Sequence, residues 1–318
     1  MTVMQRPFLQ SVLLAMLLAI GSLALAGQPI IPIPRQMDID PDKARLGQRL
    51  FSDRRLSRDL STACASCHDP RRGGVDHRPV STGVEGRKGK LNAPTVWNAW
   101  FNFRQFWNGR AEDLKEQARG PIHNPMEMDM RDELVNARLQ ADSGYQRDFR
   151  RIYGRQPNLE DALDAIVEFE RALYTPDSRF DRWLRGDSTA LSEKEREGYR
   201  LFKRIGCISC HNGINVGGNS YQYFGAVVPV KGLREAGDRY DLTGDDFDRA
   251  RYKVPSLRNI TRTAPYFHDG SVARLDEAVR LMAYHNLGFD LTEEEVDKIV
   301  AFLRTLEGKP PAILDGTP

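Results

Sequence analysis

Two short stretches of the chain, residues 64–68 (CASCH) and 207–211 (CISCH), share the pattern C-x-x-C-H. In this pattern, two thiols bond covalently to a haem and the adjacent histidine supplies an axial nitrogen to the iron. The motifs use all four cysteines of the chain. A thioredoxin-like pair or a zinc site also uses C-x-x-C, but neither requires a histidine directly after the second cysteine, twice. We therefore predict two haem c groups attached at Cys64, Cys67, Cys207 and Cys210, with His68 and His211 as proximal ligands.

The composition is that of an ordinary soluble protein with one large or two medium domains. The 318 residues are 40% hydrophobic and 28% charged, and the formal net charge is +2. So small a net charge does not favour a nucleic-acid-binding surface.

The N-terminus has the features of an export signal. Arg6 precedes an apolar stretch from Phe8 to about Leu25, and the small residues of 24–26 (ALA) come just before Gly27. A retained membrane anchor is the alternative, although the small-residue site favours cleavage. We predict a cleaved signal peptide over residues 1–26 and a periplasmic protein that is free of the membrane after cleavage, in agreement with haem attachment outside the cytoplasm.

The elements that must position the two motifs are mainly helical. Apolar spacing predicts helices over residues 41–51, 112–119, 132–139, 159–173, 193–202, 275–284 and 292–306. Asp40 with Pro41 is a helix start, and Ser192 with Glu195 and Thr292 with Glu295 are capping boxes. Within residues 212–251 there are few strand signals beyond 226–230, and the Gly-rich segment 72–90 is predicted to be a loop.

The two halves of the chain repeat each other. The segment GQRLF (47–51) precedes the first motif and GYRLF (198–202) the second, while PTVWN (94–98) matches PSLRN (255–259). Thirteen residues after the proline of each segment stand Trp107 in the first half and His268 in the second. We predict two cytochrome-c-like domains that arose by duplication, residues 27–178 and 179–318, each with one haem.

The sixth ligand of each iron decides its chemistry. An iron with two strong ligands transfers electrons, whereas an open iron can bind and activate a small molecule. Met282 is the only methionine of the second half and lies on a predicted helix, so it is the best candidate for a soft ligand to the second iron. A lone methionine is also ordinary core filler, and the residues alone leave the two interpretations open.

Several longer motifs carry a resemblance to a known family. They are NAPT (92–95), FWNGR (106–110), VPSLRN (254–259) and TAPYFHDG (263–270), together with the two C-x-x-C-H stretches. With these motifs the chain resembles the bacterial di-haem cytochrome c peroxidases, in the superfamily that includes the MauG enzymes, from about residue 40 to 308. The resemblance implies that Met282, on the helix after FHDG, is the axial ligand of the C-terminal haem. MauG enzymes have a tyrosine there, so the methionine favours the peroxidase branch.

The resemblance also assigns roles to residues between the motifs. Trp107 matches a tryptophan between the two haems that relays electrons, although it is also a good core aromatic. Gln117 and Glu127 match the distal pocket of the N-terminal haem, and a carboxylate there fits the proton transfers that peroxide cleavage needs. Asn92 and the backbone carbonyls of Thr263 and Pro265 match an interdomain calcium site, whose oxygen ligands suit Ca²⁺.

One departure from the family pattern concerns the resting state. Many of these peroxidases have a histidine sixteen residues after the first C-x-x-C-H histidine, and it caps the oxidised N-terminal haem. Here that position is Val84, followed by Glu85, and His77 comes seven residues too early. We therefore predict an N-terminal haem that is five-coordinate or weakly water-bound when oxidised, and activity that needs no prior reduction.

The sequence thus predicts an enzyme that reduces hydrogen peroxide to water with electrons from a small cytochrome c or a cupredoxin. The first alternative is a MauG-like enzyme that uses peroxide to oxidise residues of a partner protein. The second is a di-haem electron carrier, which would need His77 or His123 to cap the first iron. The sequence decides neither the physiological donor nor whether the chain forms a homodimer.

Overall fold

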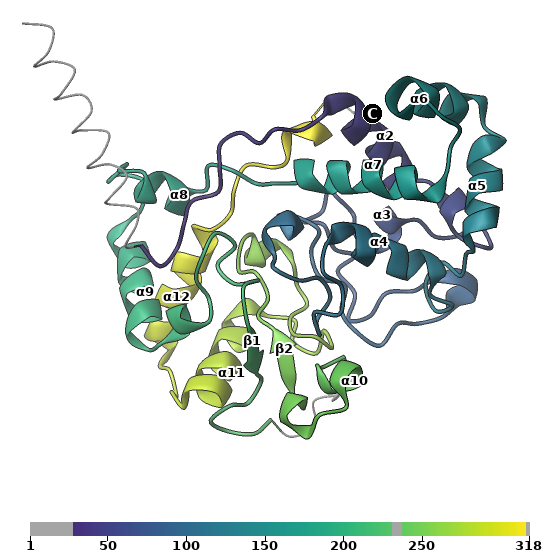
Figure 1. Ribbon diagram of the computed structural model, residues 1–318. Coiled ribbons are helices and arrows are strands. Elements are labelled where there is room, and N and C mark those ends of the chain that lie inside the picture. The colour runs from purple at the N-terminus through teal and green to yellow at the C-terminus, as the bar shows by residue number, and fades with distance from the viewer. Residues whose placement is uncertain (1–27, 231–236, 316–318) are drawn as a thin grey trace, which may run out of the picture.

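The structure is a computed structural model that describes residues 28–230 and 237–315. It is mainly helical, with two groups of helices side by side and long loops between them (Figure 1). The first group is α2 (Pro41–Phe51), α3 (Cys64–Cys67), α4 (Leu114–His123), α5 (Asp132–Gln140), α6 (Ser143–Tyr153) and α7 (Leu159–Ala172). The second group is α8 (Arg179–Leu184), α9 (Glu193–Arg204), α10 (Tyr240–Thr243), α11 (Leu275–Leu287) and α12 (Glu293–Arg304). Single 3₁₀ turns occur at Arg54–Leu56, Val84–Gly86, Ala99–Phe101, Cys207–Ser209, Asp246–Asp248, Ile260–Arg262 and Ala312–Leu314.

Helix starts are set by local side-chain caps. The Asp40 carboxylate accepts hydrogen bonds from the first free amides of α2, with Pro41 in the first helical position. Ser192 and Glu195 form a capping box on α9, and Thr292 and Glu295 form another on α12. These three predictions from the sequence are confirmed.

Each half has its own hydrophobic core around one close helix pair. In the first half α2 packs on α7, and in the second α9 packs on α12. The contacts are close because of matching glycines: a Cβ on Gly47 would lie 1.8 Å from the Ala165 carbonyl oxygen, and one on Gly198 would lie 1.9 Å from the Lys298 carbonyl oxygen. The predicted pair of cytochrome-c-like domains related by duplication is confirmed.

The repeat continues through the loops that join the halves. Asn98 and Asn259 both adopt the left-handed conformation, with φ of 61° and 57°, and so do Phe106 and Phe267, with φ of 68° and 69°. The side-chain amides of Asn98 and Asn259 both donate to the hydroxyl of Thr175, over 2.8 and 2.9 Å. Thr175 therefore lies where the two repeats meet.

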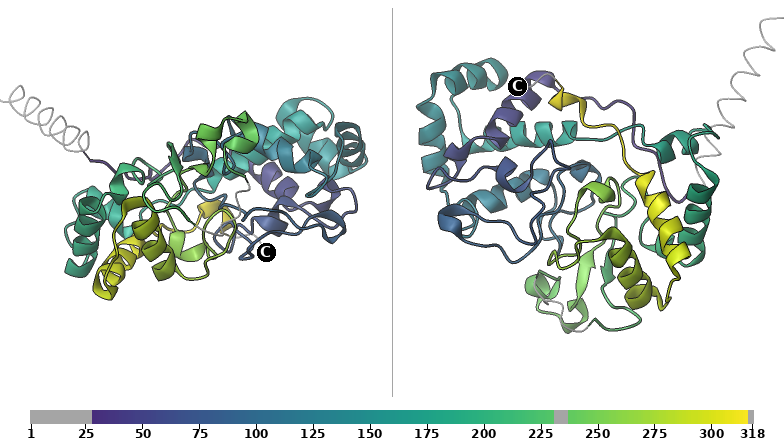
Figure 2. Two further views of the ribbon diagram at one scale, coloured as in Figure 1. Left: turned by 90° about the horizontal axis from the view of Figure 1, so that it is seen from below. Right: turned by 180° about the vertical axis from the view of Figure 1, so that it is seen from behind.

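The two ends of the described chain cross between the halves (Figure 2). Ile30, near the start, is fully buried in the second core, whereas Ile313 and Leu314, near the end, pack on the first core. The domain boundaries drawn from the sequence stay a prediction, and these terminal segments are the parts that pack on the opposite half. The predicted signal peptide lies outside the described residues.

One predicted element is wrong and several helices were missed. Residues 226–230 form no strand, because the amides of Val227 and Val228 donate to the His285 carbonyl at the end of α11. The described strands are instead β1 (Tyr221–Tyr223) and β2 (Arg251–Lys253), which pair antiparallel. Helix α6 and the shorter helices α3, α8 and α10 were not predicted.

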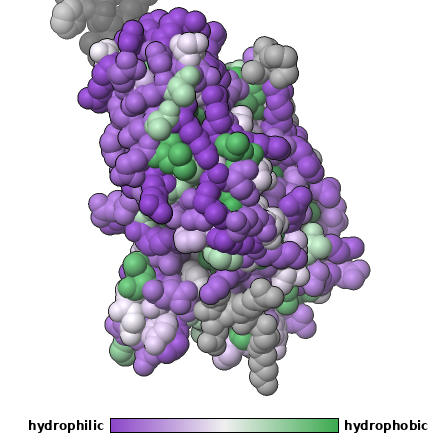
Figure 3. Space-filling view, turned by 90° about the vertical axis from the view of Figure 1, so that its right-hand side faces the viewer, coloured by the Kyte–Doolittle hydropathy of each residue, from purple (hydrophilic) through white to green (hydrophobic). Residues whose placement is uncertain are grey.

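The surface over the first half is polar. On the face shown in Figure 3, hydrophobic side chains occur singly or in small groups among hydrophilic ones. Within the described ranges, no helix combines the length and the apolar character needed to cross a bilayer.

Candidate functional site

The second C-x-x-C-H motif lies at the wall of an apolar cavity in the C-terminal half. Cys207, Cys210 and His211 line this cavity together with Met282, which α11 contributes. Around them the walls are mostly aliphatic and aromatic side chains, which come from α9, α11 and α12 and from loops of both halves. Two thiols, an imidazole and a thioether facing one apolar space are the donor set of a His/Met haem c, so these residues fit that cofactor.

Both motif histidines are in the neutral form that can bind a metal through Nε2. Burial lowers the pKa of His211 to about 4 and lowers the pKa of His68 below its ordinary value, so both rings are neutral at pH 7. Nδ1 of His211 lies 3.4 Å from the Val216 carbonyl oxygen. Nδ1 of His68 is buried beside the Gly74 carbonyl but completes no hydrogen bond of ordinary geometry. Hydrogen bonding through Nδ1 is the usual way to orient a histidine that ligates metal through its other nitrogen.

The first motif forms the short helix α3 at the edge of the first core. Burial raises the pKa of the Cys64 thiol to about 12, and the nearby Glu170 carboxylate adds to the shift. Burial also raises the pKa of the Cys67 thiol, and the negative charge of Glu127 adds to the shift of both thiols. Each thiol is therefore neutral at pH 7.

Glu127 lies in the turn that follows α4. Its amide donates to the Asn124 carbonyl, and the Asn124 side-chain amide donates to Oε1 of Glu127 over 2.8 Å. Burial raises the pKa of Glu127 above its ordinary value, while Arg110 and the bond from Asn124 partly oppose the shift. Gln117 lies ten residues earlier, on α4 itself. One helix and its C-terminal turn thus supply both predicted distal residues.

The position of the absent capping histidine is next to Glu127. Val84 is fully buried, and its amide donates to the Glu127 carbonyl over 2.8 Å. Gly83 has no room for a side chain, since a Cβ there would lie 2.6 Å from the same carbonyl oxygen. Glu85 holds the loop by ion pairs with Arg58 and Arg87.

The other two histidines of the first half are bonded elsewhere. The His77 ring lies between the carbonyl oxygens of Ala264 and Arg72, at 3.1 and 3.0 Å. His123 forms a 2.6 Å contact with the Asp132 carboxylate at the partly exposed end of α4.

Trp107 comes from the first half but lines the cavity of the second motif. Its indole N–H donates to the Asn92 carbonyl over 2.9 Å, and its ring centroid lies 6.3 Å from that of His268. The two residues that the repeat aligned are therefore neighbours at the junction of the halves.

The residues of the predicted calcium site face the same cavity. Asn92, Thr263 and Pro265 all line it. The Asn92 side-chain amide donates to the Arg78 carbonyl over 2.9 Å, which leaves Oδ1 available to a cation. The set is oxygen-only, as Ca²⁺ prefers.

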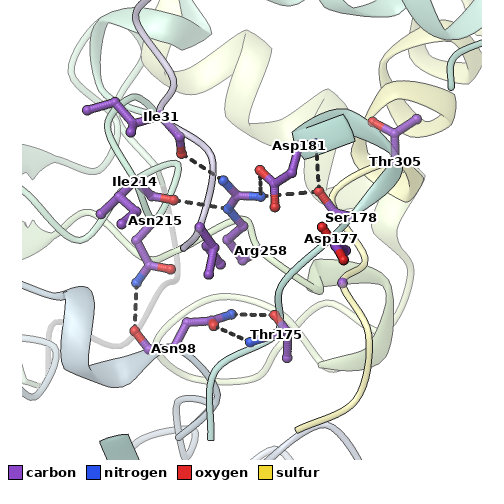
Figure 4. Close-up of polar contacts among 12 residues, drawn as sticks. Ile31, Asn98, Thr175, Asp177, Ser178, Asp181, Ile214, Asn215, Arg258 and Thr305 are labelled. Carbon is purple, nitrogen blue, oxygen red and sulfur yellow. Dashed lines mark hydrogen bonds and ion pairs between the residues drawn. The ribbon is translucent and has the colours of Figure 1, made fainter. Parts of the chain in front are cut away.

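Arg258 has a structural role (Figure 4). It is fully buried, and its guanidinium donates to the Asp181 carboxylate over 2.7 Å and to the Ile31 carbonyl over 3.0 Å. The Ile214 carbonyl and the Ser178 hydroxyl accept its remaining bonds. With its donors directed to these partners, Arg258 ties α8 and the N-terminal segment to the loop that follows β2.

Two buried charged residues were missed from the sequence. Glu170, on α7, is 3% exposed, has no hydrogen bond to Oε2 within the described residues, and has a pKa that burial raises to about 8. Lys253, at the end of β2, is 7% exposed and lines the second cavity. In both cases the only local signal was a charged residue inside an apolar pattern.

The fold and the two motifs define a di-haem protein of the cytochrome c class. Residues 41–189 match the di-haem cytochrome c peroxidase family, and residues 195–307 match the cytochrome c family. The cytochrome c551 peroxidase of Nitrosomonas europaea is 44% identical over 304 residues, which cover 95% of this chain and 91% of that protein. The chain belongs to the di-haem cytochrome c peroxidases and carries covalently bound haem.

Further relatives include both branches of the superfamily. The cytochrome c peroxidase Ccp of Escherichia coli is 46% identical over 88% of this chain, which spans 61% of that protein's length. The methylamine utilization protein MauG of Methylorubrum extorquens is 33% identical over 89% of this chain and 83% of its own. Among solved structures, a MauG-like protein associated with microbial copper homeostasis matches with a TM-score of 0.77 at 28% identity, over 91% of this chain and 95% of that one.

Proposed function

We propose that this chain is a periplasmic peroxidase that reduces hydrogen peroxide to water with electrons from a small cytochrome c or a cupredoxin, and that it is active without prior reduction. Relatives at 42–46% identity over most of the chain are named cytochrome c peroxidases. Met282 in the cavity of the second motif supports the electron-transfer role of that half.

The observation that carries the proposal is the pairing of Val84 with Glu127. The residue that would cap the first iron is an aliphatic side chain, and its backbone is bonded directly to the predicted catalytic residue. His77 and His123 are both engaged with other partners. A haem held at the first motif would therefore receive no sixth ligand from residue 84, His77 or His123.

Glu127 is the group that transfers protons in the proposed reaction. When bound, the N-terminal haem supplies the iron that binds peroxide, and the C-terminal haem supplies stored electrons. The raised pKa of Glu127 suits a group that takes a proton from one peroxide oxygen and returns it to the other. Asn124 holds Oε1 and so fixes the direction of the carboxyl group. We assign to Gln117, on α4, the orientation of the peroxide.

Trp107 connects the halves. Its ring lies in the wall of the second cavity, and its backbone belongs to the first half. We assign it the electron relay between the two haems, and we assign Asn92, Thr263 and Pro265 to a calcium ion that fixes the junction around it.

The test compares steady-state peroxide turnover by the di-haem protein with and without pre-reduction by ascorbate. We expect equal initial rates and a high-spin EPR signal from the first haem in the oxidised protein. A lag that pre-reduction removes, together with a bis-histidine low-spin signal, would overturn the proposal.

A second candidate is a MauG-like oxidation of a partner protein. Val84 favours it, because the MauG branch also lacks the capping histidine, whereas Met282 opposes it. Consumption of reduced cytochrome c with peroxide at a useful rate supports the first function. Peroxide consumption that depends on a protein substrate but not on cytochrome c supports the second.

A further inference from the structure

Lys253 is a buried cation that the proposed reaction does not use. It is the last residue of β2, and its backbone amide donates to the Trp107 carbonyl over 2.7 Å. Its side chain lines the same cavity as Cys207, Cys210 and Met282. The backbone bond fixes Lys253 in the wall whatever its side chain does.

The ammonium group has no carboxylate partner within the described residues. Arg251, two residues earlier on the same strand, is paired with Asp248 at 3.0 Å, but no described acidic group lies within ion-pair distance of Lys253. Burial alone lowers the pKa of Lys253 to about 8. A buried ammonium without a counter-ion is strongly destabilising, so the arrangement calls for an anion from the cavity itself.

The walls of the cavity supply no such anion. Among the described residues that line it, none is Asp or Glu, and Lys253 is the only Lys or Arg. A haem attached at Cys207 and Cys210 brings two propionate groups, each anionic at neutral pH, into this space. The charges are complementary: one unpartnered cation faces a ligand with two carboxylates.

We propose that Lys253 binds a propionate of the C-terminal haem as its buried counter-ion and thereby raises the reduction potential of that haem. The effect on the reduction potential follows from the charge of the ammonium group. Reduction removes one positive charge from the iron, so a fixed cation nearby favours the reduced state. The inference rests on the covalent haem and not on the peroxidase reaction, so either can fail without the other.

The test is a set of three variants of the di-haem protein, each titrated spectroelectrochemically. Lys253→Met removes the charge, Lys253→Arg keeps it, and Lys203→Met is the matched control, since Lys203 is an exposed lysine of the same half whose ammonium lies over the Tyr199 ring. Because the Lys253 backbone bond to Trp107 does not depend on the side chain, we expect all three to fold and bind haem.

For Lys253→Met we expect the one-electron reduction equilibrium of the C-terminal haem to weaken about tenfold or more, a downward shift of about 59 mV per tenfold. Lys253→Arg should retain most of the wild-type potential, and the N-terminal haem should be unaffected in every variant. The propionate bending bands in the resonance Raman spectrum should move in the Met variant and not in the control.

An unchanged potential and unchanged propionate bands in Lys253→Met would overturn the inference. Should that variant fail to mature, the unsubstituted protein with ¹⁵N-labelled lysine gives the answer. A label-sensitive ammonium band in the reduced-minus-oxidised infrared difference spectrum supports a lysine at the haem, and its absence overturns the assignment.

Discussion

Replacing Glu127 by Gln isolates proton transfer from packing. Glutamine has nearly the same volume, and its carbonyl oxygen can still accept the 2.8 Å hydrogen bond from Asn124. What it loses is the ability to take up and release a proton. Positioned acid–base groups contribute about 10²–10⁴-fold in rate, so we expect kcat to fall by that factor, or about 2.7–5.4 kcal/mol of barrier.

The assay is peroxide turnover with reduced cytochrome c, normalised to bound haem. Glu133→Gln is the matched control, because Glu133 is an exposed carboxylate on α5, away from the turn that holds Glu127. Its kcat should match the wild type. A Glu127→Gln protein with both haems bound and kcat within twofold of wild type would refute the reasoning.

The pH dependence of the activity is a second test of the Glu127 carboxyl group. Burial raises the pKa of Glu127, and the base is the ionised form, so activity should rise with pH through an inflection above the ordinary value of 4.5. The bond from Asn124 favours the ionised form. Asn124→Ala should therefore move the inflection to higher pH, whereas a profile that stays in place would show that another group titrates.

Three further outcomes follow from buried or substituted positions. Arg258→Met should lower the free energy of unfolding by about 3–5 kcal/mol in urea titrations, because Asp181 is left buried and unpaired; adding Asp181→Asn should recover part of the loss, and no recovery would contradict the pairing argument. Val84→His should give a low-spin EPR signal from the first haem and make activity depend on pre-reduction, and an unchanged resting spectrum would count against the assigned position. Glu170 has a folded pKa of about 8 against 4.5 when unfolded, so the folded state holds its proton longer; stability should fall as pH rises from 4.5 to 8, and Glu170→Gln should flatten that dependence between pH 5 and 8.

The features that could be predicted are those that neighbouring residues determine. The capping boxes of α9 and α12 need only residues three positions apart, and the haem motifs need only five. Helix α6 had comparable signals: Asp142 at its start, Gly154 at its end, and Tyr145 and Phe149 buried on one face. It was missed because its apolar residues are few among many charged ones, not because the pattern was absent.

Features that depend on distant partners could not be read from the sequence. Strands β1 and β2 are separated by 27 residues in the sequence, and their pairing is decided by the tertiary fold. The burial of Glu170 and Lys253 likewise depends on which elements cover them. A charged residue in the sequence predicts a surface position unless the elements that cover it are known, and for Lys253 they form the wall of the cavity of the second motif.

The repeat explains how two similar halves acquire different chemistry at their junction. Each half sends one backbone amide across to the other: Asn92 donates to the His268 carbonyl and Lys253 to the Trp107 carbonyl, both over 2.7 Å. Asn92 and Lys253 stand two residues before the matched prolines, so they are equivalent positions of the repeat, as are Trp107 and His268. Because backbone atoms make these bonds, the junction holds whatever the side chains are.

The four side chains at the junction are therefore free to differ between the halves. One half contributes an indole and an amide, the other an imidazole and an ammonium, and all four line the single cavity of the C-terminal motif. A symmetric backbone thus presents an asymmetric set of side chains to one haem. The same reasoning predicts that exchanging side chains at these positions changes haem potentials and electron transfer far more than it changes the stability of the junction.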